Sequence, residues 1–457
     1  MPPEGSAGSK MGVSLTYAVY TALLALSLIL TLPYWLLQML RHGKYRAGLR
    51  QRLGAVSSAL RANSGKPTIW VHAVSVGEVV ASSAVVEELR RQFPSHRVLI
   101  STTTSTGQKL AAKRFGEENV FYFPLDFGFA IRPYLEALRP ELCVIAETEF
   151  WPNFLRLARK SGARIAVINC RISDRSYPNY KRIRRWLPGV LDDVDLFLGQ
   201  TEEDKKRLLN IGAAEDRVRV AGNLKFDVAP PPAPKIVGSL RAALGEPGNP
   251  TALAWPVVVC GSTLEDEEAP LLAAFHNILA THPKATMILA PRHPERFAEV
   301  AALVEKLDIQ LVRRSLWSGE PLAGCVFLLD SIGELAALYS LATVAFVGGS
   351  LVPRGGHNIL EPALYGVPIV TGTHYENFRS IVNVFLSRNA VRVVGLADLP
   401  LVFMELIGNE TQRATLGRNA LAALESQRGA TANTINALVA LMGQKSGENT
   451  ASSGGKR

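Results

Sequence analysis

Short runs of apolar residues recur along the chain and are separated by segments of helical length. The runs in the first half fall at 68–74, 97–102, 119–125, 142–147, 164–169, 195–200 and 217–222, and those in the second half at 256–262, 286–291, 325–330, 343–349, 367–372 and 391–395. They are rich in Val, Ile and Leu without polar alternation, which is typical of parallel strands buried on both faces. The intervening segments, such as "VVASSAVVEELRRQF", have helical spacing. This alternation predicts an α/β fold with parallel sheets.

A segment rich in proline and glycine, "DVAPPPAPKIVGSLRAALGEPGNPTA" at 227–252, divides the runs into two sets. Such a composition is typical of a linker. We therefore expect two doubly wound, Rossmann-like domains facing a cleft, with ligands bound outside the carboxyl ends of the strands. The expected boundaries are 45–228 for the first domain, 229–250 for the linker, 251–442 for the second domain and 443–457 for a disordered polar tail.

Residues 11–40 contain no charged side chain. A helix needs about 20 apolar residues to cross the bilayer core, so this segment predicts a transmembrane anchor. Cations follow it at Arg41, Lys44, Arg46, Arg50 and Arg52, which by the positive-inside rule places the rest of the chain in the cytoplasm. A signal peptide would have a shorter apolar core preceded by its charges. A helix lying in the membrane interface is the remaining alternative, because Pro33 could break the helix.

The chain is basic, with 50 Lys and Arg against 40 Asp and Glu and a net charge of +10. Nucleic acid is one partner for a basic chain, but we find no nucleic-acid-binding motif. An anionic membrane surface or a phosphorylated lipid is the other, and the apolar anchor favours it. A second basic cluster, "RISDRSYPNYKRIRRW" at 171–186, is either a solvated helix face or a docking surface for lipid phosphates.

The remaining metal and thiol signals are weak. Four cysteines (Cys143, Cys170, Cys260 and Cys325) lie far apart without paired spacing, so we expect reduced core residues. The eight histidines form no HExxH motif, so no metal site is expected. The D-x-D in "LDDVD" at 191–195 precedes a strand, which favours a surface turn.

Polar residues follow several strands of the second half. Pro291 and Arg292 end one strand, and Gly333 and Glu334 begin a helix. In "GGHNILEP" at 355–362, a helix starting near Asn358 would aim free N–H groups at an anion, and Glu361 could accept two ribose hydroxyls. These ends predict a nucleotide site, with a capped turn as the alternative.

Carboxylates follow strands of the first half. In "HAVSVGEVV", Gly77 permits a tight turn and Glu78 lies at a helix start, where it either caps the helix or removes a proton from an attacking hydroxyl. Glu147 and Glu149 follow another strand. Lys225, in "GNLKFD", could offset charge that builds up in a transition state.

Together these motifs resemble those of the 3-deoxy-D-manno-octulosonic acid (Kdo) transferases. The shared motifs run in order from about 70 to 380 and include "VHAVSVGE", "STTTSTG", "AETEFWPN", "NCRISDRS", "QTEEDKKRL", "GNLKFD", "GSTLEDEE", "APRHPERF", "IGELAALY", "FVGGSLVPRGGHNILEPA" and "GTHYENF". The resemblance implies a GT-B glycosyltransferase that needs no metal or other cofactor. It implies inverting transfer of Kdo from CMP-Kdo to the lipid A precursor, at the cytoplasmic face of the inner membrane of a Gram-negative bacterium.

The resemblance also implies roles for individual residues. Glu78 maps to the proposed base, and Glu147, Glu149 and Lys225 map to supporting positions. The CMP contacts map to Pro291, Arg292, Gly333, Glu334, Leu335, Asn358, Ile359, Leu360 and Glu361. Two other hypotheses stay open: a GT-B enzyme that uses a UDP-sugar on a polyprenyl-linked acceptor, and a membrane-tethered scaffold that binds no nucleotide.

Overall fold

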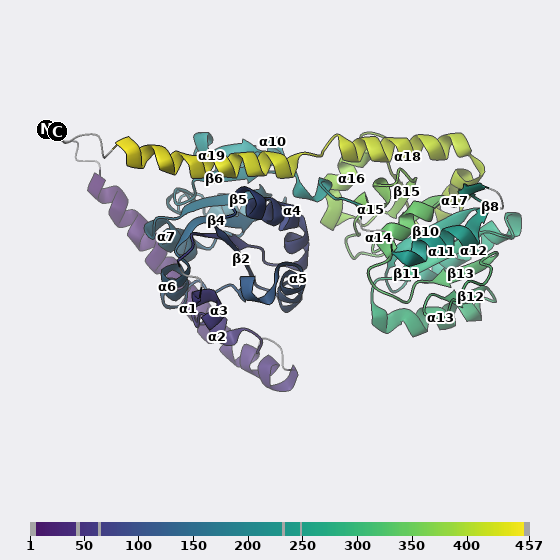
Figure 1. The fold of residues 1–457 in the computed structure, drawn as a ribbon, viewed down its shortest axis with the longest axis horizontal. Helices are drawn as coiled ribbons and strands as arrows, with labels where there is room; N and C mark the ends of the chain where they lie inside the picture. The colour runs from purple at the N-terminus through teal and green to yellow at the C-terminus, as the bar shows by residue number, and fades with distance from the viewer. Residues whose placement is uncertain (1–5, 43–45, 63–64, 231–233, 247–248, 452–457) are drawn as a thin grey trace. The chain divides into compact units, whose positions relative to one another are not determined.

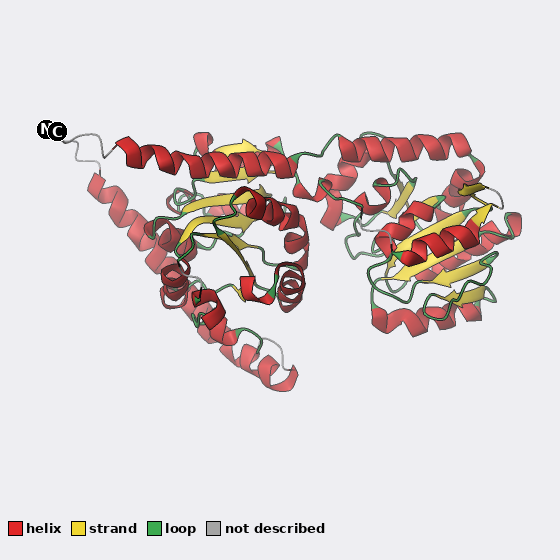
Figure 2. Cartoon of the chain, viewed as in Figure 1, coloured by secondary structure: helices red, strands yellow, loops and turns green. Residues whose placement is uncertain are grey.

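The computed structural model describes residues 6–42, 46–62, 65–230, 234–246 and 249–451. The chain forms two compact units, the first built from Met1–Asp227 with Arg428–Arg457 and the second from Val228–Gln427. Helices and strands alternate in both units, as Figure 2 shows. The predicted α/β fold with two parallel sheets is confirmed.

The sheet of the first unit has the strand order β3-β2-β1-β4-β5-β6-β7, and all of its pairs are parallel (Figure 1). The strands are β1 (Thr68–His72), β2 (Arg97–Thr102), β3 (Val120–Tyr122), β4 (Pro140–Ala146), β5 (Arg164–Cys170), β6 (Leu196–Gly199) and β7 (Val218–Val220). Each one overlaps a predicted run, although β4 begins two residues before its run and β5 ends one residue after its run. The order reverses between β1 and β4, and ligands of doubly wound sheets bind at such a switch point.

Helices cover both faces of this sheet, because alternate residues of each strand point to opposite sides. Trp70 packs in the cluster on one face and Val71 in the cluster on the other. The first face is covered by α6 (Gly128–Leu138), α7 (Pro152–Lys160), α9 (Pro188–Leu191) and α10 (Glu202–Ile211), and the second by α4 (Val76–Gln92), α5 (Ser105–Phe115) and α19 (Ala430–Ala451). Shorter elements are α2 (Leu49–Arg52), α3 (Ser58–Arg61), α8 (Tyr177–Arg182), η1 (Glu117–Asn119), η2 (Glu215–Arg217) and η3 (Leu224–Phe226).

The position of α19 differs from the predicted domain boundaries. This helix follows the second unit in the chain but packs on the first, where Ile435 and Leu438 are buried in one cluster with residues of α4. The helix continues through Ala451, within the segment predicted to be disordered, and 452–457 lie outside the described residues. Apolar periodicity predicts a helix but does not say which of two cores the helix completes.

The sheet of the second unit has the order β12-β13-β11-β10-β14-β15-β16, again with parallel pairs throughout. The strands are β10 (Val257–Thr263), β11 (Thr286–Pro291), β12 (Gln310–Arg313), β13 (Cys325–Leu328), β14 (Val344–Val347), β15 (Ile369–Gly372) and β16 (Arg392–Val394). The edge strand β12 was not predicted, because only two apolar residues lie between its polar ends.

Helices also lie on both faces of the second sheet. One face carries α12 (Glu268–Thr281), α13 (Phe297–Lys306), α17 (Leu399–Gly408) and α18 (Glu410–Glu425), and the other α11 (Lys235–Leu244) and α14 (Leu335–Leu338). The remaining helices are α15 (Leu360–Ala363), α16 (Arg379–Leu386), η4 (Pro294–Arg296), η5 (Tyr339–Leu341) and η6 (Glu376–Phe378).

The segment predicted as a linker is largely structured. Leu240 and Leu244 of α11 are buried in a core cluster of the second unit. A small antiparallel hairpin follows, formed by β8 (Gly245–Glu246) and β9 (Asn249–Leu253). Some of the prolines and glycines that suggested a linker lie inside these elements, such as Gly238 in α11 and Pro250 in β9, so composition alone concealed the elements.

The uncharged N-terminal segment lies within one helix, α1 (Ser6–His42). Pro33 lies inside this helix and does not end it. Among the described residues, α1 is the one helix that is long and apolar enough to cross a membrane, over Leu15–Arg41. The four cysteines are free and buried, as expected.

Candidate active site

The carboxyl ends of β1 and β4 lie side by side, where the strand order of the first sheet reverses. Directly after β1, Ser75 is the N-cap residue of α4 and Glu78 lies in the first turn. The Glu78 carboxylate accepts hydrogen bonds from the backbone N–H of Val74 (2.7 Å) and from the Ser75 hydroxyl (2.9 Å). A Ser-x-x-Glu sequence at a helix start is typical of a capping box, but the Ser75 side chain makes no capping bond to the helix backbone here. The hydrogen bonds from Val74 and Ser75 instead fix the Glu78 carboxylate itself at the switch point.

The pKa of Glu78 is displaced toward neutrality. Burial raises it from 4.5 to about 7, and the negative charges of Glu147 and Glu149 add to this effect against the two hydrogen bonds. Only 8% of the residue is exposed. A carboxyl group that is half ionised near neutral pH is suited to accept a proton as a general base.

Glu147, Glu149 and Lys225 gather beside Glu78. Glu147 has a φ of 59°, an uncommon conformation for glutamate. One of its carboxylate oxygens lies 3.7 Å from Nζ of Lys225. Burial, and then the charge of Glu147, raises the pKa of Glu149. The structure thus brings the four predicted residues of the first unit together at one sheet edge.

Lys225 is positioned by residues that the sequence analysis did not single out. Asn169, at the end of β5, has a φ of 52° and accepts the backbone N–H of Leu224 at 3.0 Å. Asn223 accepts the backbone N–H of Lys225 at 3.0 Å. Gln200 donates to the carbonyl oxygen of Asn169 at 3.0 Å. The asparagines in "NCRISDRS" and "GNLKFD" were the available signals.

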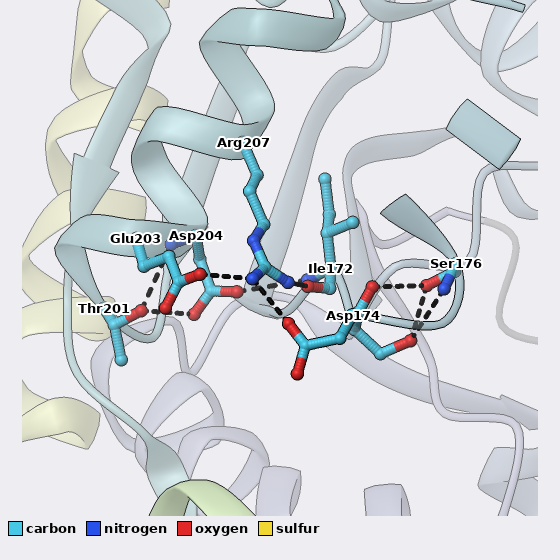
Figure 3. Close-up of polar contacts among 8 residues, drawn as sticks. Ile172, Asp174, Ser176, Thr201, Glu203, Asp204 and Arg207 are labelled. Carbon is cyan, nitrogen blue, oxygen red and sulfur yellow. Dashed lines mark hydrogen bonds and ion pairs between the residues drawn. The ribbon is translucent and has the colours of Figure 1, made fainter. Parts of the chain in front are cut away.

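The loop at 171–176, which follows β5, is held by α10 (Figure 3). Arg207 donates to the carbonyl oxygen of Ile172 and to the carboxylate of Asp174, both at 2.6 Å. Asp204 accepts the backbone N–H of Ile172 at 3.1 Å. These contacts fix the start of the basic cluster beside the carboxyl end of β5.

In the second unit, Arg292 follows Pro291 at the end of β11. Its backbone N–H donates to the carbonyl oxygen of Thr263, at the end of β10, at 2.9 Å. Burial raises the pKa of Glu361, and the charge of Arg292 opposes this shift. Burial, and then Arg292, lowers the pKa of His357 to about 4. The structure therefore brings Arg292, His357 and Glu361 together, and His357 was not predicted.

The helix expected to begin near Asn358 begins two residues later and is very short. The structure has a single turn, α15, that starts at Leu360. The Asn358 side chain accepts the backbone N–H of Leu360 at 3.1 Å and donates to Glu361 at 3.4 Å. Asparagine side chains compete for backbone groups in this way. Asn358, Ile359, Leu360 and Glu361 thus form a turn stabilised by the asparagine rather than the start of a long helix dipole.

The carboxylate of Glu334 is engaged within its own unit. It accepts two hydrogen bonds from Arg314, at 2.9 and 3.0 Å, and a short one from Ser331. Burial raises the pKa of Glu334, but these bonds outweigh burial and the pKa lies below its usual value. Gly333 has a φ of 94°, which favours glycine, and Leu335 begins α14.

Glu267 is a buried residue that sequence reasoning missed. Its carboxylate accepts the backbone N–H groups of Leu264 (2.9 Å), Gly349 (2.6 Å), Ser350 (2.8 Å) and Leu351 (2.8 Å). It thereby fixes the turn that leads from β14 into the glycine-rich loop. The motif "GSTLEDEE" contained this residue without indicating its role.

The described part of the chain contains no group of three or more His, Cys, Asp or Glu residues placed to hold a metal ion. The D-x-D segment forms a turn between α9 and β6, as predicted. Its Asp193 accepts a short hydrogen bond from Tyr17, and Asp195 pairs with Arg159.

Comparison with known proteins shows what the chain is similar to. A profile of the family described as 3-deoxy-D-manno-octulosonic-acid transferase (kdotransferase) matches residues 47–228. The 3-deoxy-D-manno-octulosonic acid transferase of Haemophilus influenzae is 32% identical, over 92% of this chain and 97% of that protein. The protein of the same name from Bordetella pertussis is 33% identical, over 92% and 98% of the two chains.

Solved structures share the fold. A glycosyltransferase from Rickettsia africae matches with a TM-score of 0.53 and 14% identity, over 83% of this chain and 98% of that chain. At this identity the match supports the two-unit architecture alone.

Proposed function

Because this chain belongs to the family of 3-deoxy-D-manno-octulosonic acid (Kdo) transferases, we propose that it moves Kdo from CMP-Kdo to the lipid A precursor lipid IVA. The chain is a glycosyltransferase, and its pathway is lipopolysaccharide biosynthesis. The acceptor and the nucleotide-sugar donor are our assignments. They rest on the family and on the polar residues at the two sheet edges.

In the proposed reaction Glu78 is the general base. A hydroxyl of the acceptor attacks the anomeric carbon of Kdo, and the Glu78 carboxylate accepts the hydroxyl proton. The bond from that carbon to the phosphate oxygen breaks, and CMP leaves with the electron pair. A single in-line displacement inverts the anomeric carbon. The observation that carries this role is a buried, hydrogen-bonded carboxyl with a pKa of about 7 at the switch point of the first sheet.

We assign the nucleotide to the second unit. Arg292 would face the phosphate that gains charge as CMP leaves, and Glu361 would accept the ribose hydroxyls. The backbone at Pro291, at Gly333–Leu335 and at Asn358–Leu360 would complete the contacts. The proximity of Arg292 to Glu361 supports this assignment. Transfer in this scheme needs no metal ion or other cofactor.

We also propose that the enzyme acts at the cytoplasmic face of the inner membrane of a Gram-negative bacterium. The apolar length of α1 supports this location. The cations that follow α1 favour the side with anionic lipid and a cytoplasmic location.

The test is a transfer assay on the detergent-solubilised chain with CMP-Kdo generated in place, lipid IVA and EDTA, with products identified by mass spectrometry. We expect the mass of the acceptor to rise by one or more Kdo units. Glu78→Gln should abolish transfer and leave CMP binding intact, whereas Glu87→Gln, on the exposed side of α4, should retain transfer. Near-wild-type turnover of Glu78→Gln would refute the base assignment.

A separate binding titration with CMP and with UDP identifies the nucleotide. The proposal predicts binding of CMP in preference to UDP. No product with intact donor, together with preferential UDP binding, would replace the proposal with the UDP-sugar enzyme acting on a polyprenyl-linked acceptor.

A further inference from the structure

The start of α1 is attached to the first unit by polar contacts. The Tyr17 side chain is buried, and its hydroxyl donates to Asp193 and to the carbonyl oxygen of Gly189. Thr21 and Asn153, the second residue of α7, exchange hydrogen bonds of 3.0 and 3.2 Å. A helix end surrounded by lipid would have no protein groups to hydrogen-bond with. These contacts therefore show that this end of α1 packs against the protein.

The segment after α1 is attached to the same unit. The Arg52 guanidinium donates to the carbonyl oxygen of Thr103, and its backbone carbonyl accepts the N–H of Leu125 at 2.8 Å. The backbone at Gly48 passes so close to the ring of Tyr122 that a Cβ there would overlap it. Figure 1 shows the first part of α1 beside the first unit and its later part extending beyond the unit.

Both attachments cannot hold if α1 crosses a bilayer. From Thr21 to Arg41 the helix rises about 30 Å at 1.5 Å per residue, which equals the thickness of the hydrocarbon core. If Thr21 stayed on the unit, Arg41 would emerge on the far side. The seven residues that lead to Gly48 reach at most about 25 Å and could not return through lipid as open backbone. If Arg41 stayed instead, Tyr17 would lie on the far side and lose Asp193.

The rest of α1 nevertheless exposes apolar side chains that lipid would cover. Its most exposed apolar side chains include Leu23, Leu26, Ile29, Leu30 and Leu40, each more than half exposed. Exposed arginines flank its carboxyl end at Arg41, Arg46 and Arg50. An exposed apolar helix flanked by cations matches one leaflet of a bilayer that carries anionic headgroups.

The same edge of the unit carries other membrane-facing signals. Tyr17 contacts Arg156 and Thr21 contacts Asn153, so α1 runs antiparallel to α7, which leads away from the carboxyl end of β4. The later residues of α1 therefore extend past the carboxyl edge of the sheet. Near that edge Phe129, Ile183 and Trp186 are exposed, at 61%, 48% and 50%. Aromatic residues next to arginines are typical of a membrane interface.

We propose that α1 lies in one leaflet, alongside the first unit, and does not cross the membrane. The inference rests on the contacts of α1 and not on the proposed reaction. It replaces the predicted transmembrane anchor with the in-plane alternative. It also presents the carboxyl edge of the first sheet, with Glu78, to the lipid surface from which an acceptor would come.

Two cysteine experiments in cells test this arrangement, and the four native cysteines are buried. The first is a Thr21→Cys, Asn153→Cys pair, treated with a short bis-maleimide in intact membranes. We expect intramolecular cross-linking. The matched pair Thr21→Cys, Glu87→Cys should not cross-link, because α4 and α7 cover opposite faces of the sheet.

The second experiment places a single cysteine at Ser9 and labels spheroplasts with a membrane-impermeant maleimide. We expect labelling only after the membrane is opened, as for the control Arg41→Cys. Labelling of Ser9→Cys in intact spheroplasts would show that α1 crosses, and would overturn the proposal. Protection without cross-linking of the Thr21 pair would also overturn it, because α1 would then lie away from the unit. Neither outcome depends on transfer activity.

Discussion

Replacing Glu78 by glutamine should stabilise the folded chain at alkaline pH while it removes the proposed base. The substitution keeps the shape of the side chain. The amide oxygen can still accept the Val74 N–H, and the Ser75 hydroxyl can turn to accept a bond from the amide nitrogen. The main change is therefore the loss of a negative charge that burial disfavours.

The size of the effect follows from the pKa of Glu78, which rises from 4.5 to about 7 on folding. The folded chain then holds this proton more tightly than the unfolded chain. Its contribution to stability is complete below pH 4.5 and is lost as the pH rises through about 7. Since one pKa unit is worth about 1.36 kcal/mol, the loss amounts to about 3 kcal/mol. Glutamine does not ionise, so the Glu78→Gln variant does not lose this stability as the pH rises.

Urea denaturation followed by tryptophan fluorescence measures this difference at pH 5 and pH 8. We expect the stability of Glu78→Gln relative to the original chain to rise by about 2–3 kcal/mol between the two values. Glu87→Gln, on the exposed side of the same helix, should show no such rise. A difference that does not change with pH, or a variant that is less stable at pH 8, would refute the argument from burial.

Three further changes test the electrostatics and packing of the two units. Glu147→Gln should move the midpoint of the pH–rate profile below about 7, because a neighbouring negative charge that raises the pKa of the base is lost. Glu267→Gln should cost about 1–3 kcal/mol in urea denaturation, because an amide N–H would then face backbone N–H donors, whereas the exposed Glu265→Gln should be neutral. Gly372→Ala should destabilise the chain by about 1–3 kcal/mol, because its Cβ would lie 2.1 Å from a backbone oxygen, whereas Gly238→Ala in an open position of α11 should stabilise it by up to about 1 kcal/mol.

Unchanged stability of Glu267→Gln would show that the four backbone donors find other partners. A tolerated alanine at Gly372 would mean that the loop after β14 can move away from β15. If the pH midpoint of Glu147→Gln does not move, the charge of Glu147 does not raise the pKa of Glu78.

The strands were predictable because doubly buried strands need unbroken apolar runs. The edge strand β12 is not buried on both faces and has no such apolar run, so it was missed. Prolines on either side of α11 suggested a linker, and the burial of Leu240 became visible only with the core it completes. Local sequence therefore predicts elements well when burial constrains every residue, and poorly at edges and junctions.

The residues of the candidate site likewise fall into those that the local sequence predicts and those that it does not. Glu78 was predictable because helix starts and strand ends are marked locally in the sequence. Glu267 was not, because three of its four backbone donors lie 82 to 84 residues away. Asn169 likewise acts on a residue 55 positions away. Residues that shape a loop from a distance carry no local signal.

The return of α19 to the first unit has a consequence for synthesis on the ribosome. Its apolar side chains complete the face that α4 covers, and Asp227 accepts the backbone N–H of Gly429 at 2.7 Å. About 200 residues of the second unit are made between these two partners. At about 5–20 residues per second, the nascent first unit waits about 10–40 s with that apolar groove open. Chaperone capture of the growing chain should therefore concentrate in this interval and end when α19 emerges.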